Sequence, residues 1–204
     1  KGSTSGSGNG SGNEYERELD KLKATIPQWN CLFSLSDEEE FMTAYTKMKN
    51  GGARLVDKYA WAVPDERALK IIKEFSAPAG VVEIGSGRGY WMKCLEERGV
   101  DIIGYDLPLV VDEDDGQHMW SKSVLKGGPE KLKTKQCKGR TLLLCYPDEA
   151  NSLAMECLET LSPESVYIIH VGELMMSGTF MGGEQRPFGR TSTADFQVAL
   201  AEGF

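Results

Sequence analysis

Acidic residues and glycines between positions 83 and 106 have the types and spacing needed to bind a nucleotide-type ligand. Glu83 precedes the regularly spaced Gly85, Gly87 and Gly89, and Asp106 follows them. Glycines let a backbone turn sharply and approach a ligand where any Cβ would collide. An acidic side chain about 20 residues after such a turn can accept the hydroxyl groups of a ribose. The pattern therefore predicts a nucleotide-type site.

The charge of Glu83 separates the possible ligands of this site. The carboxylate would repel a pyrophosphate, whereas it would attract the amino group and the sulfonium of S-adenosylmethionine. The turn also delivers a ligand to the start of a helix, whose free N–H groups favour a carboxylate or a phosphate. The residues favour S-adenosyl-L-methionine as the cofactor. An NAD-dependent oxidoreductase is the alternative interpretation of the same turn.

The local sequence predicts the elements that hold these residues. The apolar run 81–84 predicts a buried strand, and the glycines of 85–89 end it. Apolar residues at helical spacing follow over 90–98, and a second apolar run, 102–105, leads into Asp106. We therefore expect a strand, a glycine turn, a helix and a second strand that carries Asp106 at its carboxyl end.

The pattern Glu83-x-Gly85-x-Gly87-x-Gly89 with Asp106 resembles the first two motifs of the class I S-adenosylmethionine-dependent methyltransferases. The resemblance implies that Glu83 and the glycine loop hold the methionine end of the cofactor and that Asp106 binds its ribose. The segments YAWAVP, EIGSGRGYW and GRTS also resemble a group of methyltransferase-like proteins of eukaryotic microbes, which brings no defined activity with it.

The same family template enlarges the set of expected cofactor residues. Because the segment before the first strand often covers the cofactor in this family, Trp61 or Tyr59 is expected to form a wall of the pocket; the alternative is that both are core residues. A short third strand is expected over 121–125, where family members contact the adenine edge. The predicted cofactor-binding residues are Glu83, Gly85, Ser86, Gly87, Gly89, Tyr90, Asp106, Leu107, Ser123, Cys145 and Trp61.

The acceptor side of the site is expected after the fourth strand, 141–145. Methyltransferases that act on amino groups of nucleic acids and proteins commonly carry there an Asp or Asn, two prolines and an aromatic residue. The tetrad 145–148 keeps only one proline in register. We expect Tyr146 and Asp148 to contact the methyl acceptor as catalytic residues. The alternative is that Pro147 and Asp148 only begin a helix over 149–161.

Residues 1–13 are nearly all Gly, Ser and Asn and are expected to form a flexible linker. Residues 14–64 are expected to form a helical cap, and residues 65–204 a Rossmann-like core. Within the cap, a capping box at 36–39 predicts the start of the second helix, and Gly51 and Gly52 predict its end.

The predicted fold class is α/β, with a mostly parallel Rossmann-like sheet of at least five strands and helices on both faces. A fifth strand is expected over 165–171, a pocket-gating loop over 175–190 and a helix over 193–204. The basic segment 126–140 is expected to be a solvated face away from the ligand edge. The class I core normally adds a C-terminal antiparallel hairpin, and we expect it to be missing here, through truncation or in a trimmed variant.

Composition narrows the function further. The five cysteines form no CxxC pair and the histidines number only two, so neither a disulfide framework nor a metal site is predicted and a cytoplasmic location is expected. No apolar run is long enough to span a membrane. The net charge of −8 opposes general nucleic-acid binding. The expected partner is a methyl acceptor, which is a small molecule, a protein or a specific RNA. A catalytically inactive S-adenosylmethionine-binding regulator is a further alternative.

Overall fold

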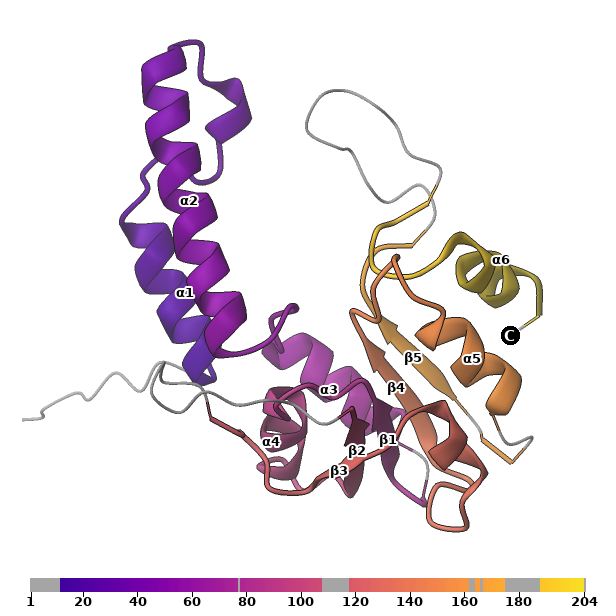
Figure 1. The fold of residues 1–204 in the computed structure, drawn as a ribbon. Helices are drawn as coiled ribbons and strands as arrows, with labels where there is room; N and C mark the ends of the chain where they lie inside the picture. Colours follow the sequence, from indigo (N-terminus) through magenta and orange to yellow (C-terminus); the bar gives the residue numbers. More distant parts are fainter. Residues whose placement is uncertain are drawn as a thin grey trace, which may run out of the picture.

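The structure is a computed structural model that describes residues 12–76, 78–107, 118–161, 164–165, 167–174 and 188–203. Its centre is an open sheet of five parallel strands in the order β3-β2-β1-β4-β5 (Figure 1). This sheet, with helices on both faces, confirms the predicted α/β, Rossmann-like fold. The strands are β1 Val81–Ile84, β2 Ile102–Asp106, β3 Val124–Lys126, β4 Thr141–Cys145 and β5 Ile168–Val171.

The strand order identifies the edge at which a ligand should bind. The chain moves outward from β1 to β2 and β3, and then returns to place β4 on the other side of β1. In open α/β sheets, ligands bind beyond the carboxyl ends of the strands, at the point where the order reverses. That point lies between β1 and β4, where Val81 is paired with Thr141 and Glu83 with Leu143.

Two apolar layers cover the sheet. Helices α3 (Glu66–Glu74) and α4 (Tyr90–Glu96) lie on one face, and helices α5 (Leu153–Thr160) and α6 (Ala194–Gly203) lie on the other (Figure 1). Alternate residues of β1 pack in the two layers, because successive side chains of a strand point to opposite faces. Val81 packs in the first layer, whereas Val82 and Ile84 pack in the second.

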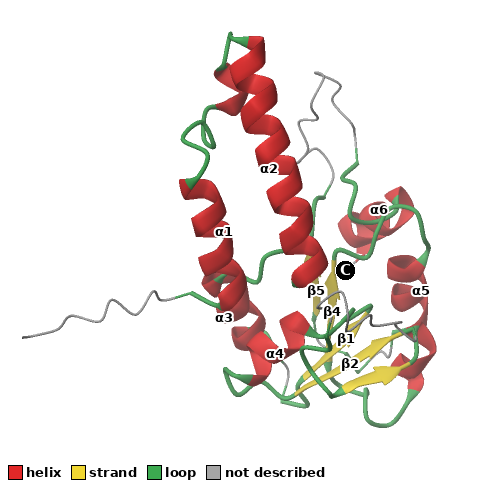
Figure 2. Cartoon of the chain, turned by 60° about the vertical axis from the view of Figure 1, so that its left-hand side comes forward, coloured by secondary structure: helices red, strands yellow, loops and turns green. Residues whose placement is uncertain are grey.

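The amino-terminal segment forms a hairpin of two long helices. Helix α1 (Glu14–Ala24) and helix α2 (Glu38–Lys58) lie side by side and extend away from the sheet (Figure 2). The short 3₁₀ helix η1 (Leu32–Ser34) lies between them in the chain. The hairpin falls within residues 14–64 and is helical as expected, whereas its role as a cap and its division from the core as a separate unit stay predictions. None of the helices in the described ranges is long and apolar enough to cross a membrane.

Helix α2 continues through Gly51 and Gly52, so the predicted end of this helix is wrong. Gly51 is buried, and a Cβ at this position would come within 2.3 Å of Leu22 Cδ1 in α1. The glycine therefore allows close contact between the helices instead of ending one. The start also differs from the predicted capping box, because Asp37 is the N-cap residue and accepts the N–H of Glu40 at 2.7 Å.

Aromatic residues attach the base of the hairpin to the core. Tyr15 of α1 stacks on Tyr59, with ring centroids 4.8 Å apart, and Trp120 stacks on the same Tyr59 ring. The backbone N–H of Tyr15 donates to the hydroxyl of Tyr90 in α4 at 2.9 Å. These contacts fix the hairpin beside the first helix of the nucleotide-type unit.

Three other boundaries differ from the predicted ones. The third strand is Val124–Lys126 instead of 121–125, and the fifth is Ile168–Val171 instead of 165–171. Helix α5 begins at Leu153, so Pro147 and Asp148 do not begin it and the expected helix over 149–161 is wrong at its start. Tyr146 and Asp148 both have positive φ, which is incompatible with a right-handed helical turn at this point.

Candidate functional site

The turn after β1 has the backbone that its glycines predict. Gly85, Gly87 and Gly89 have φ angles of 78°, 56° and 81°, a left-handed region that other residues adopt at a cost. The N–H groups of Gly85 and Ser86 both donate to the carbonyl oxygen of Tyr105 in β2, at 2.9 and 3.1 Å. The turn is therefore held against the carboxyl end of the neighbouring strand.

Asp106 binds this turn directly. The N–H of Gly87 donates to Asp106 Oδ2 at 2.5 Å, and the backbone carbonyl of Asp106 accepts the N–H of Gly127. A Cβ placed on Gly87 would meet no described atom within 4 Å, so this glycine faces open space. At Gly89, by contrast, a Cβ would lie 2.8 Å from Val124 Cγ2, which indicates a packing role.

Glu83 is a buried acid inside β1, with 1% of its surface exposed. Its pKa is raised to about 8: burial is the main cause, a hydrogen bond with the Cys145 thiol opposes it, and the charge of Asp106 adds to the increase. Burial and the neighbouring Glu83 also raise the pKa of Cys145 well above its usual value. Within the described part of the chain, Glu83 Oε2 has no hydrogen-bond partner. A cationic group at this oxygen would stabilise the ionised carboxylate.

A cavity of about 710 Å³ opens at the carboxyl edge of the sheet, between the segments that follow β1, β2, β3 and β4. It lies where the strand order reverses, as expected for a ligand site. The predicted site residues that line it are Gly85, Asp106, Leu107, Tyr146 and Asp148. The structure thus brings Asp106, which is predicted to bind a ribose, to the same cavity as Tyr146 and Asp148, which are predicted to contact the methyl acceptor.

The other predicted site residues lie outside this lining. They are Glu83, Ser86, Gly87, Gly89, Tyr90, Ser123, Cys145 and Trp61. Tyr90 is buried, and its hydroxyl accepts the N–H of Tyr15. Ser123 is exposed, and its N–H donates to Ser121 Oγ at 3.1 Å. The ring of Trp61 stacks on the ring of Tyr146, which lines the cavity.

Tyr146 and Asp148 occupy an unusual backbone after β4. Their φ angles are 53° and 74°, although neither residue is a glycine. The Tyr146 N–H donates to the Val171 carbonyl at 2.9 Å, and Asp148 Oδ1 accepts the N–H of Ala150 at 3.0 Å. Such conformations cost about 1–3 kcal/mol each and cluster at functional sites. The observation motivates a role for both side chains in ligand contact.

The prediction that the basic segment faces away from the ligand edge is wrong for Lys126 and Lys131. Both line the cavity, together with Gly127 and Gly128. Lys126 is the last residue of β3, and the two glycines turn the chain toward the 3₁₀ helix η2 (Pro129–Lys133). The sequence contains a signal for this placement, the turn Gly127-Gly128-Pro129. If the third strand is ended at this turn, both lysines fall at the carboxyl edge of the sheet.

Other lining residues follow β4 and were not predicted from the sequence. Among them, Asn151 brings an amide and Glu156 a carboxylate to the cavity wall. Glu156 lies in the first turn of α5. The expected gating loop falls mainly on 175–187, which lie outside the described residues. Among the residues that the structure does describe, no three His, Cys, Asp or Glu side chains meet as a metal site.

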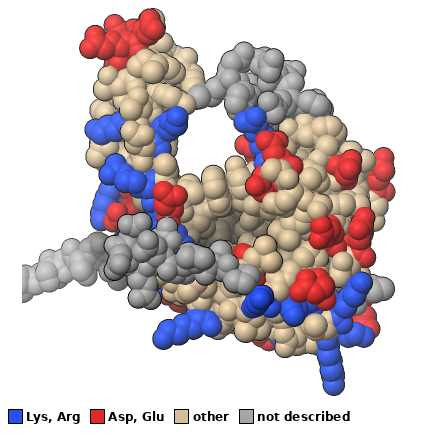
Figure 3. Space-filling view, viewed as in Figure 1, with Lys and Arg blue, Asp and Glu red and all other residues tan. Residues whose placement is uncertain are grey.

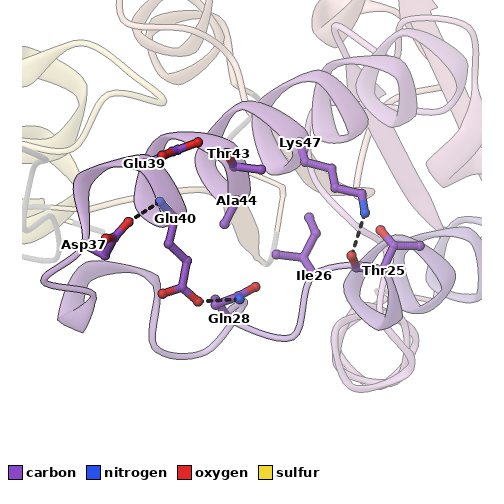
Figure 4. A pocket seen from close by; sticks show the side chains of 9 residues that line it. All are labelled: Thr25, Ile26, Gln28, Asp37, Glu39, Glu40, Thr43, Ala44 and Lys47. Carbon is purple, nitrogen blue, oxygen red and sulfur yellow. Dashed lines mark hydrogen bonds between the residues drawn. The ribbon is translucent and has the colours of Figure 1, made fainter.

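A second cavity, of about 400 Å³, lies far from the glycine turn, between the end of α1 and the start of α2 (Figure 4). Its polar groups largely bind one another. Gln28 Nε2 donates to Glu40 Oε1 at 2.7 Å, and Lys47 Nζ donates to the Thr25 carbonyl at 2.7 Å. It contains none of the predicted site residues.

No protein-family model matches the chain, and no curated protein matches it. One similar solved structure is the crystal structure of CalO1, described as a methyltransferase in calicheamicin biosynthesis in its SAH-bound form. The TM-score is 0.37 at 11% sequence identity, and the match covers 89% of this chain and 59% of CalO1. This chain therefore spans less than two thirds of the length of CalO1.

Proposed function

We propose that the protein binds S-adenosylmethionine at the carboxyl ends of β1, β2 and β4 and is a methyltransferase. The observation that carries the proposal is the buried Glu83, whose Oε2 lacks a hydrogen-bond partner within the described ranges, two residues before the glycine turn. S-adenosylmethionine, when bound, supplies an activated methyl group on a sulfonium and also carries an ammonium group. Either cation suits a carboxylate that burial and Asp106 otherwise keep protonated.

The residues around the turn fit such a cofactor. Asp106 Oδ2 is occupied by the Gly87 N–H, and its second oxygen can accept from a ribose hydroxyl. Gly87 leaves open space where a ligand can approach the backbone. Leu107 is 71% exposed and lines the cavity, so it offers an apolar surface to a base. Glu83, Gly87, Asp106 and Leu107 are the residues that we assign to the cofactor with most support.

Glu83 also distinguishes the proposed cofactor from NAD. A pyrophosphate near the turn brings no cation to the buried Glu83 and would disfavour its ionisation further, whereas Asp106 could bind a ribose of either ligand. The two lysines that line the cavity lie at the end of β3 (Lys126) and in η2 (Lys131), and neither belongs to the glycine turn. Binding of NAD at this turn is therefore the less favourable alternative.

Methyl transfer itself asks little acid or base chemistry of the protein. The chain must align the acceptor with the methyl group and exclude water from it. Tyr146 and Asp148 lie on the cavity wall after β4, and we assign them to orienting the acceptor. Asp148 can also accept a hydrogen bond or a proton if the acceptor carries one.

Calorimetric titration with S-adenosylhomocysteine tests the cofactor assignment. Asp106→Ala should weaken binding by about 1.5–3 kcal/mol, the range for hydrogen bonds to a charged group. The matched control is Asp101→Ala, because Asp101 lies before the same strand and pairs with Arg140 at 3.1 Å outside the cavity. Equal affinity of the wild type and Asp106→Ala would show that Asp106 is not the ribose ligand.

A further inference from the structure

An aromatic pair borders the cavity on the acceptor side. The ring of Trp61 lies nearly parallel to that of Tyr146, with an interplanar angle of 17° and centroids 5.6 Å apart. Tyr146 lines the cavity, whereas 69% of Trp61 is exposed. A single exposed aromatic residue does not by itself indicate a binding site. Here the exposed ring is instead stacked on a residue of the cavity wall.

The segment that carries Trp61 is held from both sides. Trp91 Nε1 of α4 donates to the Ala62 carbonyl at 3.1 Å. Asn13 Nδ2, at the start of α1, donates to the Pro64 carbonyl at 2.5 Å. These bonds fix the residues that follow Trp61 between the hairpin and the core. The backbone next to Trp61 is therefore held in place, and the stacking on Tyr146 is the contact that orients the indole itself.

The surroundings of the pair are acidic. Burial raises the pKa of Tyr146, and the charges of Glu173, Asp148 and Glu149 raise it further, while Arg190 opposes them. Arg190 Nε lies 3.5 Å from Glu149 Oε1, so its charge is shared with one of these carboxylates. Figure 3 shows acidic side chains gathered over the loop that follows β4, beside a hollow in this face of the molecule. At the Tyr146 ring three carboxylates face one guanidinium, which favours a cation, although Lys126 and Lys131 line the same cavity from the end of β3 and from η2.

We propose that the Trp61–Tyr146 pair and Asp148 form an acceptor subsite for a small organic cation that carries an ammonium group. An aromatic face attracts an ammonium through its quadrupole, and a nearby carboxylate strengthens this attraction. The inference rests on the proposed function in one respect: the bound cation is a methyl acceptor only if the protein is a methyltransferase. The cation binding itself depends only on Trp61, Tyr146 and the carboxylates around them.

Two isosteric probes separate charge from shape. Choline carries a trimethylammonium group, and 3,3-dimethyl-1-butanol has carbon in place of its nitrogen. In calorimetric titrations of the wild type, choline should bind at least tenfold more tightly than the alcohol. Equal affinity, or no choline binding, would overturn the subsite. Tighter binding of N-acetyl-lysine methylamide than of choline would contradict a small-molecule acceptor.

Variants locate the binding. Trp61→Ala should reduce choline affinity about tenfold, whereas Trp61→Phe should retain most of it. Phe33→Ala is the matched control, because Phe33 is also 69% exposed but lies in the hairpin. An equal loss in Phe33→Ala and Trp61→Ala would overturn the assignment.

A separate titration with S-adenosylhomocysteine distinguishes the two proposals. Failure of the proposed function appears as no S-adenosylhomocysteine binding by the wild type. Failure of the subsite appears as intact S-adenosylhomocysteine binding without selective binding of choline.

Discussion

Glu83 places a carboxyl group in a sheet strand, where ionisation is costly. Its pKa is about 8 in the folded protein against 4.5 in the unfolded chain. Between these values the folded state holds a proton that the unfolded state has released. Stability from this group is therefore greatest below pH 4.5, falls as pH rises toward 8, and is constant above it. The residue is thus a cost to the free protein, as expected if its charge serves a ligand.

Glu83→Gln should remove this pH dependence. As pH rises from 5 to 8.5, the wild type should lose stability relative to the variant, by at most about 4 kcal/mol. The reason is that Gln has no proton to release and can still bind the Cys145 thiol. Urea unfolding at several pH values under reducing conditions measures the difference. Parallel stability curves for the two proteins would contradict a buried, proton-holding Glu83.

At the scale of elements, the glycine turn combines conformation and access. Gly87 and Gly99 both have positive φ and open space where a Cβ would lie, but Gly99 follows α4, away from the cavity. A valine at Gly87 would be strained, because β-branched residues rarely adopt such φ angles. An alanine is the milder test, since it adds only the Cβ.

Gly87→Ala and Gly99→Ala should each lose about 1–2 kcal/mol of stability, because both residues adopt left-handed backbone. Only Gly87→Ala should also lose affinity for S-adenosylhomocysteine, by about tenfold or more, because only its Cβ enters the proposed site. Thermal unfolding and calorimetry measure the two effects. If both variants bind alike, the cofactor does not approach Gly87.

The hairpin offers a second matched pair of glycines. A Cβ on Gly51 would collide with Leu22, whereas a Cβ on Gly52 would meet no described atom within 4 Å. Gly52→Ala should raise stability by about 0.5–1 kcal/mol, the usual gain for a helix interior. Gly51→Ala should lower it by about 1–3 kcal/mol through overpacking. Urea unfolding tests both, and a gain in both variants would contradict the close contact of α1 and α2.

At the scale of the whole molecule, the sequence predicted the sheet well because its strands are short apolar runs between glycines and charged residues. It also predicted that Asp106 and the residues after β4 share one edge, since parallel strands place their carboxyl ends together. It did not predict the continuation of α2 through Gly51 or the lysines at the cavity. The continuation of α2 depends on a contact between distant segments, Leu22 with Gly51, which local patterns do not contain. The lysines were missed for another reason, because the third strand was predicted to end one residue too early and the glycine turn after it was not used.

Other assignments depend on side-chain direction. Tyr90 follows the glycine turn directly, yet its hydroxyl binds the first residues of the hairpin. Trp61 does not line the cavity itself, but its ring stacks on Tyr146, which does. The roles of Tyr90, Ser86, Ser123 and Cys145 toward a cofactor stay predictions. The expected location of the protein in the cytoplasm also stays a prediction.

Native mass spectrometry of the wild-type protein, mixed with equal concentrations of S-adenosylhomocysteine and NAD, tests the central claim most directly. The buried Glu83, whose ionised form needs a cationic partner such as the ammonium group of this ligand, predicts a complex of the protein with S-adenosylhomocysteine and little with NAD. A predominant NAD complex, or no complex with either ligand at concentrations that saturate ordinary cofactor sites, would contradict the account.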